Sequence, residues 1–149
     1  MAIMCPNTPK EFEEYSFEDL AFKALETLPD DYYVFHSFSI VSTNDGKIEE
    51  SETDFIVFNQ NLGILCIEAK AGRPEYKNNR WYYGSGKEMA HDGPFRQATH
   101  RKHDLINLLK DLKLFDVVNH CKFVHAVNLF SVSGISAPQS YAGHTFPSS

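Results

Sequence analysis

Two neighbouring stretches, TDFIVF at residues 53–58 and GILCIEAK at residues 63–70, decide the fold. Each is short and rich in β-branched or aromatic residues, and a turn-forming segment separates them, so we expect an antiparallel hairpin. If the turn lies midway between them, Asp54 falls opposite Glu68, and opposite residues of such a hairpin are close neighbours. Lys70 shares a face with Glu68 because strand side chains alternate between the two faces.

The two acids and the lysine would lie at the end of an otherwise apolar hairpin, where two interpretations are open. Close carboxylates repel each other unless a cation neutralises them, and Mg²⁺ or Mn²⁺ takes carboxylate, carbonyl, water and phosphate oxygens as ligands. Such a cation activates water and stabilises charge on a phosphoryl group, and a neighbouring lysine can assist. The alternative is an ordinary half-exposed strand end in which Glu68 and Lys70 form a surface pair.

Periodicity and turn residues place further elements around this hairpin. We expect a helix capped by Ser16 and stopped by Pro29, a second helix from Pro94, strands over residues 32–41, 52–58, 63–69 and 122–130, a loop over 42–47, and a short strand over 80–83. This order predicts an α/β (α+β) fold, with a central mixed sheet flanked by helices. The apolar stripe of the second helix would end at Leu112.

Each helix contributes a polar side chain that can approach the acid pair. Glu18 borders the apolar stripe of the first helix, so it can reach the carboxylate site as a third acid or complement the helix dipole. Gln97 lies one turn into the second helix and can orient a water or a phosphate near the metal. His100 and His103 are three residues apart, but no zinc-protease motif accompanies them, so we do not expect a zinc site.

Basic side chains of the second half are candidates for contacts with nucleic acid. Arg101 lies four residues after Gln97, on the same helix face, and can contact a phosphate backbone. Solvated helix charge is the simpler interpretation of Arg96 and Lys102. The full set that we consider for nucleic-acid binding is Arg73, Arg96, Arg101 and Lys102.

The composition is that of a globular domain with an uneven distribution of charge. The 149 residues are 42% apolar and carry a net charge of −6, with thirteen acids and three lysines in residues 1–60. This distribution suits either an acidic metal-binding face beside a basic one or two solvated faces. The three cysteines are scattered and no leader or membrane-spanning run is evident, so we expect a reduced, cytoplasmic chain with no membrane partner.

Two further regions leave alternatives open. We divide the chain into a domain at residues 1–130 and a tail at residues 131–149, which has no Asp, Glu, Lys or Arg and would be either poorly ordered or packed on the sheet. Aromatic side chains after the hairpin are expected to be exposed, where they would form a symmetric dimer surface or cap the sheet. These residues are Tyr76, Trp81, Tyr82 and Tyr83.

Several of these segments together resemble the NERD (nuclease-related) domain, which belongs to the PD-(D/E)xK, restriction-endonuclease-like superfamily. The matching pieces are Glu18, LPDDYYV at residues 28–34, ETDFIVF at 52–58, GILCIEAK at 63–70, Trp81 and GPFRQA at 93–98. The resemblance implies an αβββαβ core and a metal-dependent nuclease. It maps the family's acids, lysine and helix glutamine to Glu18, Asp54, Glu68, Lys70 and Gln97. Thr53 stands where the superfamily often has proline.

Our leading hypothesis is a Mg²⁺- or Mn²⁺-dependent DNA nuclease that acts in DNA processing, repair or defence, alone or with a helicase partner, and as a monomer or a homodimer. The metal ligands would be Asp54, Glu68, the Ala69 carbonyl and, directly or through water, Glu18. Lys70 would position the attacking water. Two alternatives remain open: a catalytically inactive nucleic-acid-binding or docking module of the same fold, and a subunit that is active only within a helicase or defence complex.

Overall fold

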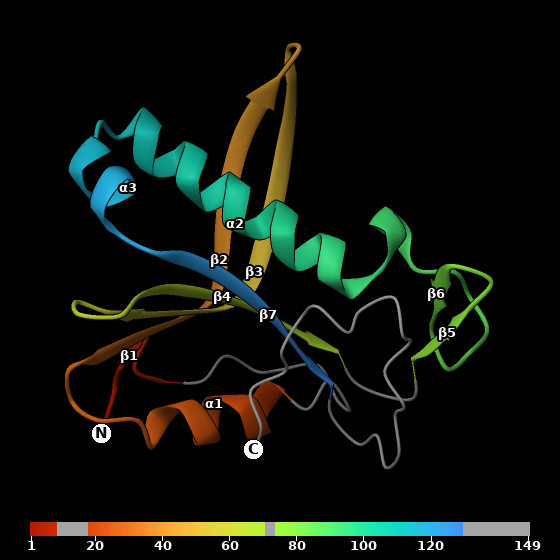
Figure 1. The fold of residues 1–149 in the computed structure, drawn as a ribbon, viewed down its shortest axis with the longest axis horizontal. Helices are drawn as coiled ribbons and strands as arrows, with labels where there is room; N and C mark the ends of the chain where they lie inside the picture. The colour runs from red at the N-terminus through yellow and green to blue at the C-terminus, as the bar shows by residue number, and fades with distance from the viewer. Residues whose placement is uncertain (9–17, 71–73, 130–149) are drawn as a thin grey trace.

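The computed structural model describes residues 1–8, 18–70 and 74–129, and its elements follow the expected order (Figure 1). In chain order they are β1 (Ile3–Cys5), α1 (Glu18–Glu26), β2 (Tyr32–Asn44), β3 (Lys47–Asn59), β4 (Gly63–Lys70), β5 (Glu75–Lys77), β6 (Arg80–Tyr82), the 3-10 helix η1 (Ala90–Asp92), α2 (Pro94–Asp111), α3 (Phe115–His120) and β7 (Phe123–Leu129). The elements α1, β2, β3, β4, α2 and β7 form the predicted αβββαβ core, which confirms the α+β fold. The added elements β1, β5, η1 and α3 are too short for periodicity to reveal them.

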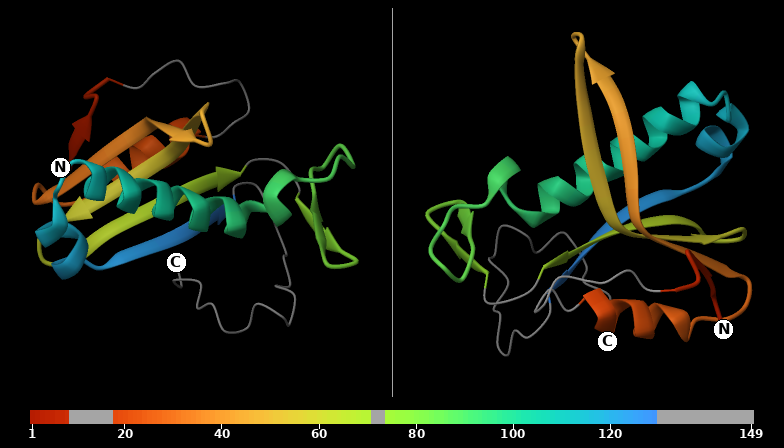
Figure 2. Two further views of the ribbon diagram at one scale, coloured as in Figure 1. Left: turned by 90° about the horizontal axis from the view of Figure 1, so that it is seen from above. Right: turned by 180° about the vertical axis from the view of Figure 1, so that it is seen from behind.

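A five-stranded mixed sheet with the order β1-β2-β3-β4-β7 forms the middle layer. β2, β3 and β4 pair antiparallel, whereas β1 pairs parallel to β2 and β7 pairs parallel to β4. Figure 2 shows α1 on one face of this sheet and α2 on the other. Phe22 of α1 packs against Val34 and Phe55, while Leu105 of α2 packs against Ile56 and Cys66, so each face has its own apolar core.

The expected loop over residues 42–47 is wrong, because β2 and β3 continue as a long hairpin that is joined by only two residues. Asp45 and Gly46 have φ angles of 49° and 76°, and Asn44 pairs with Lys47. Positive φ at both positions is typical of the tight turn that matches strand twist, and Asp-Gly is one of its preferred sequences. The hairpin therefore projects well beyond the sheet (Figure 1).

Two smaller expectations are also corrected, and one is confirmed. The exposed fraction of Leu112 is 59%, because α2 ends at Asp111 and the apolar stripe ends with it. The short strand over residues 80–83 is β6, which pairs with β5 in a separate two-stranded sheet. Trp81 of this strand is buried, with an exposed fraction of 4%, so it is not part of an exposed aromatic surface.

The cap Ser16 and the tail at residues 131–149 lie outside the described residues. No helix in the described ranges is long and apolar enough to cross a membrane.

Candidate active site

The register of the β3–β4 hairpin is the predicted one. Phe58 pairs with Ile64, and the last backbone pair joins Phe55 to Ile67. Asp54 and Glu68 are the next residues of the two strands and therefore occupy the predicted opposite positions. Beyond this point β3 continues to pair with β2 but no longer with β4 (Figure 1).

Asp54 lies where the regular alternation of side chains along the β2–β3 hairpin is interrupted. Phe35 and Phe38 of β2 both pack in the cluster beneath α2, although residues three apart in a regular strand point to opposite faces. Between them, Ser37 has a φ of 51°, and the neighbouring pairs His36–Phe55 and Phe38–Thr53 place Ser37 opposite Asp54. Positive φ is unusual for a residue other than glycine, and such strain is common at functional sites.

The Asp54 carboxylate bridges the opening between the two strands. Its Oδ2 accepts a hydrogen bond of 2.8 Å from the backbone N–H of Ala69, so a side chain replaces the backbone partner that β3 would otherwise offer. The N–H and C=O groups of one strand residue project toward the same neighbouring strand. The Ala69 carbonyl therefore also faces this opening.

Glu68 and Lys70 form a largely buried ion pair rather than an exposed surface pair. The Lys70 Nζ lies 2.9 Å from the Glu68 Oε1, and the exposed side-chain fractions are 18% and 8%. Burying charged groups costs free energy that mutual attraction only partly offsets. The predicted alternative of an ordinary half-exposed strand end therefore does not describe these two side chains.

The surroundings of Asp54 raise its pKa from 3.8 to about 7. Burial is the largest cause, and the negative charges of Glu68 and Glu18 add to it; the hydrogen bond from Ala69 and the positive charge of Lys70 act in the opposite direction. Glu18, the first residue of α1, is thus among the charged groups that act on Asp54. A divalent cation here would lower the pKa of Asp54 again, because opposite charge favours the ionised form.

The donor set fits a hard divalent cation held by two acids. Two carboxylates and a backbone carbonyl, completed by water, are the oxygen ligands that Mg²⁺ takes. Among the described residues, no group of three His, Cys, Asp or Glu side chains is gathered closely enough to hold a metal. Glu18 is thus near the acid pair without joining it in a three-acid cluster, and His100 and His103 do not complete a metal centre in the described part of the chain.

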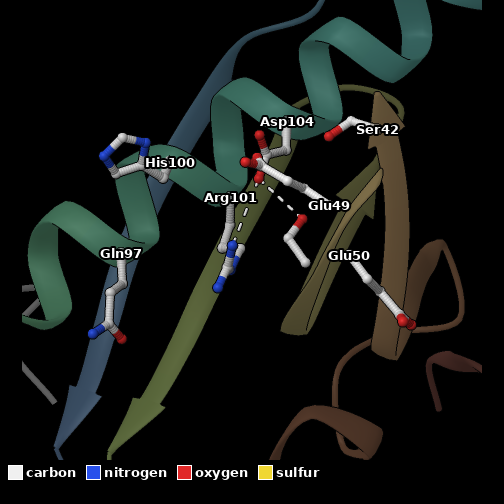
Figure 3. Close-up of a pocket in the computed structure, with 8 residues that line it drawn as sticks. Ser42, Glu49, Glu50, Gln97, His100, Arg101 and Asp104 are labelled. Atoms are coloured by element: carbon white, nitrogen blue, oxygen red, sulfur yellow. Dashed lines mark hydrogen bonds and ion pairs between the residues drawn. The ribbon is translucent and has the colours of Figure 1, made fainter. Parts of the chain in front are cut away.

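Gln97 and Arg101 line a cleft of about 550 Å³ between α2 and the β2–β3 hairpin (Figure 3). The other lining residues are Ser42, Glu49, Glu50, Ser51, His100 and Asp104. Ser51 donates a hydrogen bond of 3.0 Å to Asp104, which joins the hairpin to α2. Sequence reasoning missed this cleft, because Ser51 and Asp104 lie 53 positions apart and no periodic pattern connects them.

The predicted nucleic-acid-binding residues have different surroundings. Arg101 Nη1 lies 3.6 Å from the Asp104 carboxylate, and the exposed Arg96 lies 3.9 Å from that of Asp92. Lys102 is half-buried on α2. Arg73 lies outside the described residues.

The fold defines the class of protein: a nuclease-like α+β domain with helices on both faces of a mixed sheet. The chain belongs to the nuclease-related domain (NERD) family, whose family model matches residues 13–131. This match confirms the resemblance found in the sequence and supports a nuclease-related function. No curated protein and no solved structure matches the chain.

Proposed function

We propose that this domain is a metal-dependent DNA nuclease that hydrolyses phosphodiester bonds with Mg²⁺ or Mn²⁺. The observation that carries the proposal is the group formed by the buried Glu68 and the half-buried Asp54 and Lys70 at the point where β3 leaves β4. Two close acids destabilise a fold unless a cation compensates them, so their burial favours a functional role.

The residues present can divide the chemistry among themselves. Asp54, Glu68 and the Ala69 carbonyl would hold the metal, and Glu18 would act on it through water from α1. The bound cation would supply an activated water and stabilise charge on the phosphoryl group. Lys70, held 2.9 Å from Glu68, can donate a hydrogen bond to that water or to a phosphate oxygen.

The setting of the reaction is part of the proposal. We infer that the DNA is processed in the cytoplasm during repair or defence, with a helicase partner or a second copy of the chain where both strands of a duplex must be cut.

A cleavage assay tests this function. Plasmid and single-stranded DNA are incubated with the purified chain and Mg²⁺ or Mn²⁺, with and without chelator. Wild-type protein should cleave, and both chelation and the double change Asp54→Ala/Glu68→Ala should abolish cleavage. Glu52→Gln is the matched control, because this exposed acid lies on the same strand two residues before Asp54. Equal behaviour of the wild type and the double variant would contradict the proposal.

A second candidate is a catalytically inactive nucleic-acid-binding or docking module of the same fold. The pairing of Arg96 and Arg101 with acids and the acids that line the cleft favour its docking form, since neither feature suits tight contact with a phosphate backbone. Salt-dependent DNA binding that proceeds without cleavage, with or without a helicase, would select this candidate.

A further inference from the structure

The amide of Gln97 has a defined orientation in the structure. Gln97 is buried, and its Nε2 donates a hydrogen bond of 3.1 Å to the carbonyl oxygen of Ala90. A carbonyl oxygen can only accept a hydrogen bond, so the amide atom that faces it must be the nitrogen. Gln97 also lines the cleft between α2 and the β2–β3 hairpin (Figure 3).

The Ala90 carbonyl is itself held in place by the small β5–β6 sheet. Ala90 begins η1, and the preceding Met89 donates a backbone hydrogen bond of 2.8 Å to Trp81 of β6. At the other end of η1, Gly93 donates to the Ala90 carbonyl at 3.2 Å. The carbonyl that receives the Gln97 amide is therefore fixed from both ends of η1.

Gly93 and Trp81 form the closest part of this arrangement. Gly93 has φ 100° and ψ −177°, a conformation that is essentially restricted to glycine. A Cβ atom at Gly93 would lie only 2.2 Å from Cδ1 of Trp81, so the indole ring lies directly on the glycine backbone. The ring is held by its neighbours Tyr76 and Phe95, with centroids 5.2 and 5.9 Å away.

Gly93 also connects this contact to the first turn of α2. Its carbonyl accepts a hydrogen bond of 3.1 Å from the backbone N–H of Gln97. The backbone and the side chain of Gln97 thus both bond to the turn that Trp81 supports.

We infer that the β5–β6 sheet is a positioning device for Gln97: Trp81 and Gly93 are positioning residues that hold the Gln97 amide in one orientation, with Nε2 on the Ala90 carbonyl, in the wall of the cleft. The inference rests on the proposed nuclease function for its chemical meaning. An acceptor oxygen can hold a water molecule through one of that water's protons, whereas a phosphate oxygen has no proton to offer it. Because Nε2 is held by the Ala90 carbonyl, the Oε1 atom is assigned to the attacking water; phosphate binding through the second N–H of Nε2 is the alternative that the second experiment tests.

The first experiment reads the amide orientation without any activity. Side-chain amide signals of the metal-free, ¹⁵N-labelled full chain are recorded, and Gln97→Met identifies those of Gln97. Trp81→Leu should shift the Gln97 signals toward the values of a free amide, while Trp81→Phe, which keeps an aromatic ring on Gly93, should restore them. Unchanged signals in Trp81→Leu would overturn the inference. Because no cleavage is measured, this outcome is independent of whether the chain is a nuclease.

The second experiment separates the two roles of the amide. Binding of a fluorescent single-stranded oligonucleotide is measured in Ca²⁺, and single-turnover cleavage is measured in Mg²⁺. Gln97→Met should slow cleavage by about 100-fold, at the lower end of the range of well-placed acid–base groups, and change Kd by less than about twofold. A tenfold weaker Kd with unchanged cleavage would show that the amide binds phosphate and would overturn the inference. An inactive wild type refutes the nuclease proposal, and the amide signals then decide the positioning role alone.

Discussion

Acidic and basic side chains occur together both at the acid pair of β3 and β4 and in the cleft beside α2, but they are largely buried at the acid pair and more exposed in the cleft. Glu68 is buried and held by Lys70 at 2.9 Å, and burial raises the pKa of Asp54 to about 7. In the cleft, Glu49 and Glu50 are exposed, and the Arg101–Asp104 pair is longer, at 3.6 Å. Buried charges are costly, whereas exposed ones cost little, so the acid pair requires a functional explanation and the cleft acids do not.

The comparison also concerns backbone shape. At the acid pair the strands separate, and Ser37 has a positive φ opposite Asp54. Along the cleft the same hairpin is regular and ends in an ordinary two-residue turn. Strain and buried charge thus occur at one place, as expected where function rather than stability determines the local structure.

The largest expected effect concerns activity at the acid pair. Glu68→Gln keeps the size of the side chain but removes a charge that the metal requires, so cleavage should fall by at least about 100-fold. Glu52→Gln makes the same chemical change at an exposed position of β3 and should leave the rate within about threefold. Initial cleavage rates on a fluorescent oligonucleotide measure both effects. Equal loss of activity in Glu68→Gln and Glu52→Gln would show that the acid pair has no special role in cleavage.

Breaking the buried ion pair should have the largest effect on stability. Lys70→Met leaves the carboxylate of Glu68 buried without its cation, which should lower the free energy of unfolding by about 3 kcal/mol. Arg101→Met breaks the partly exposed pair of the cleft and should cost roughly 1 kcal/mol or less. Urea unfolding measures the stability loss of each variant. A larger loss in Arg101→Met than in Lys70→Met would contradict the conclusion that the Glu68–Lys70 pair is the more buried one.

Asp54→Asn should stabilise the fold in a pH-dependent way. The folded-state pKa of Asp54 lies above the ordinary value of 3.8, so the folded wild type binds more protons than the unfolded chain, and its stability decreases as the pH rises from about 4 to about 7. Asn has no such titration. The free energy of unfolding of the variant should therefore exceed that of the wild type by on the order of 2 kcal/mol at pH 8 and by little near pH 4.

Thermal unfolding in metal-free buffer across this pH range measures the difference. Glu52→Gln again controls for the removal of one charge from β3. A stability gain for Asp54→Asn that is equally large at pH 4 and pH 8 would contradict the raised pKa of Asp54.

The smallest effect should come from the strained serine. Ser37→Val places a β-branched residue at φ 51° and should cost about 1–2 kcal/mol, whereas Ser37→Gly should be nearly neutral. Ser39→Val is the matched control, because Ser39 is an exposed residue of the same strand that pairs with Glu52. Chemical denaturation distinguishes the three variants, and equal stability of both valine variants would show that Ser37 is unstrained.

Sequence reasoning predicted those parts of the site that depend on short-range rules. Strand alternation and one turn sufficed to place Asp54 opposite Glu68, whereas helical periodicity placed Glu18 at the border of its apolar stripe and left its approach to the two acids open. The partial burial of Lys70 and the interrupted side-chain alternation at Ser37 were not predicted, because both depend on how the hairpin bends away from β4.

Other features depend on contacts between distant segments. The bond between Ser51 and Asp104 and the contact of Trp81 with Gly93 arise only after the elements pack together. The long hairpin is different: the Asp-Gly pair at residues 45–46 was a usable local signal for a two-residue turn, and the expected loop overlooked it.

The most direct test of the account is the location of a bound cation. A crystal of the chain soaked in Mn²⁺ is measured with anomalous scattering near the manganese edge. The account predicts one strong peak about 2.1 Å from a carboxylate oxygen of Asp54, one of Glu68 and the carbonyl oxygen of Ala69. A peak that avoids these three groups, or a fully soaked crystal with no peak between Asp54 and Glu68, would contradict it.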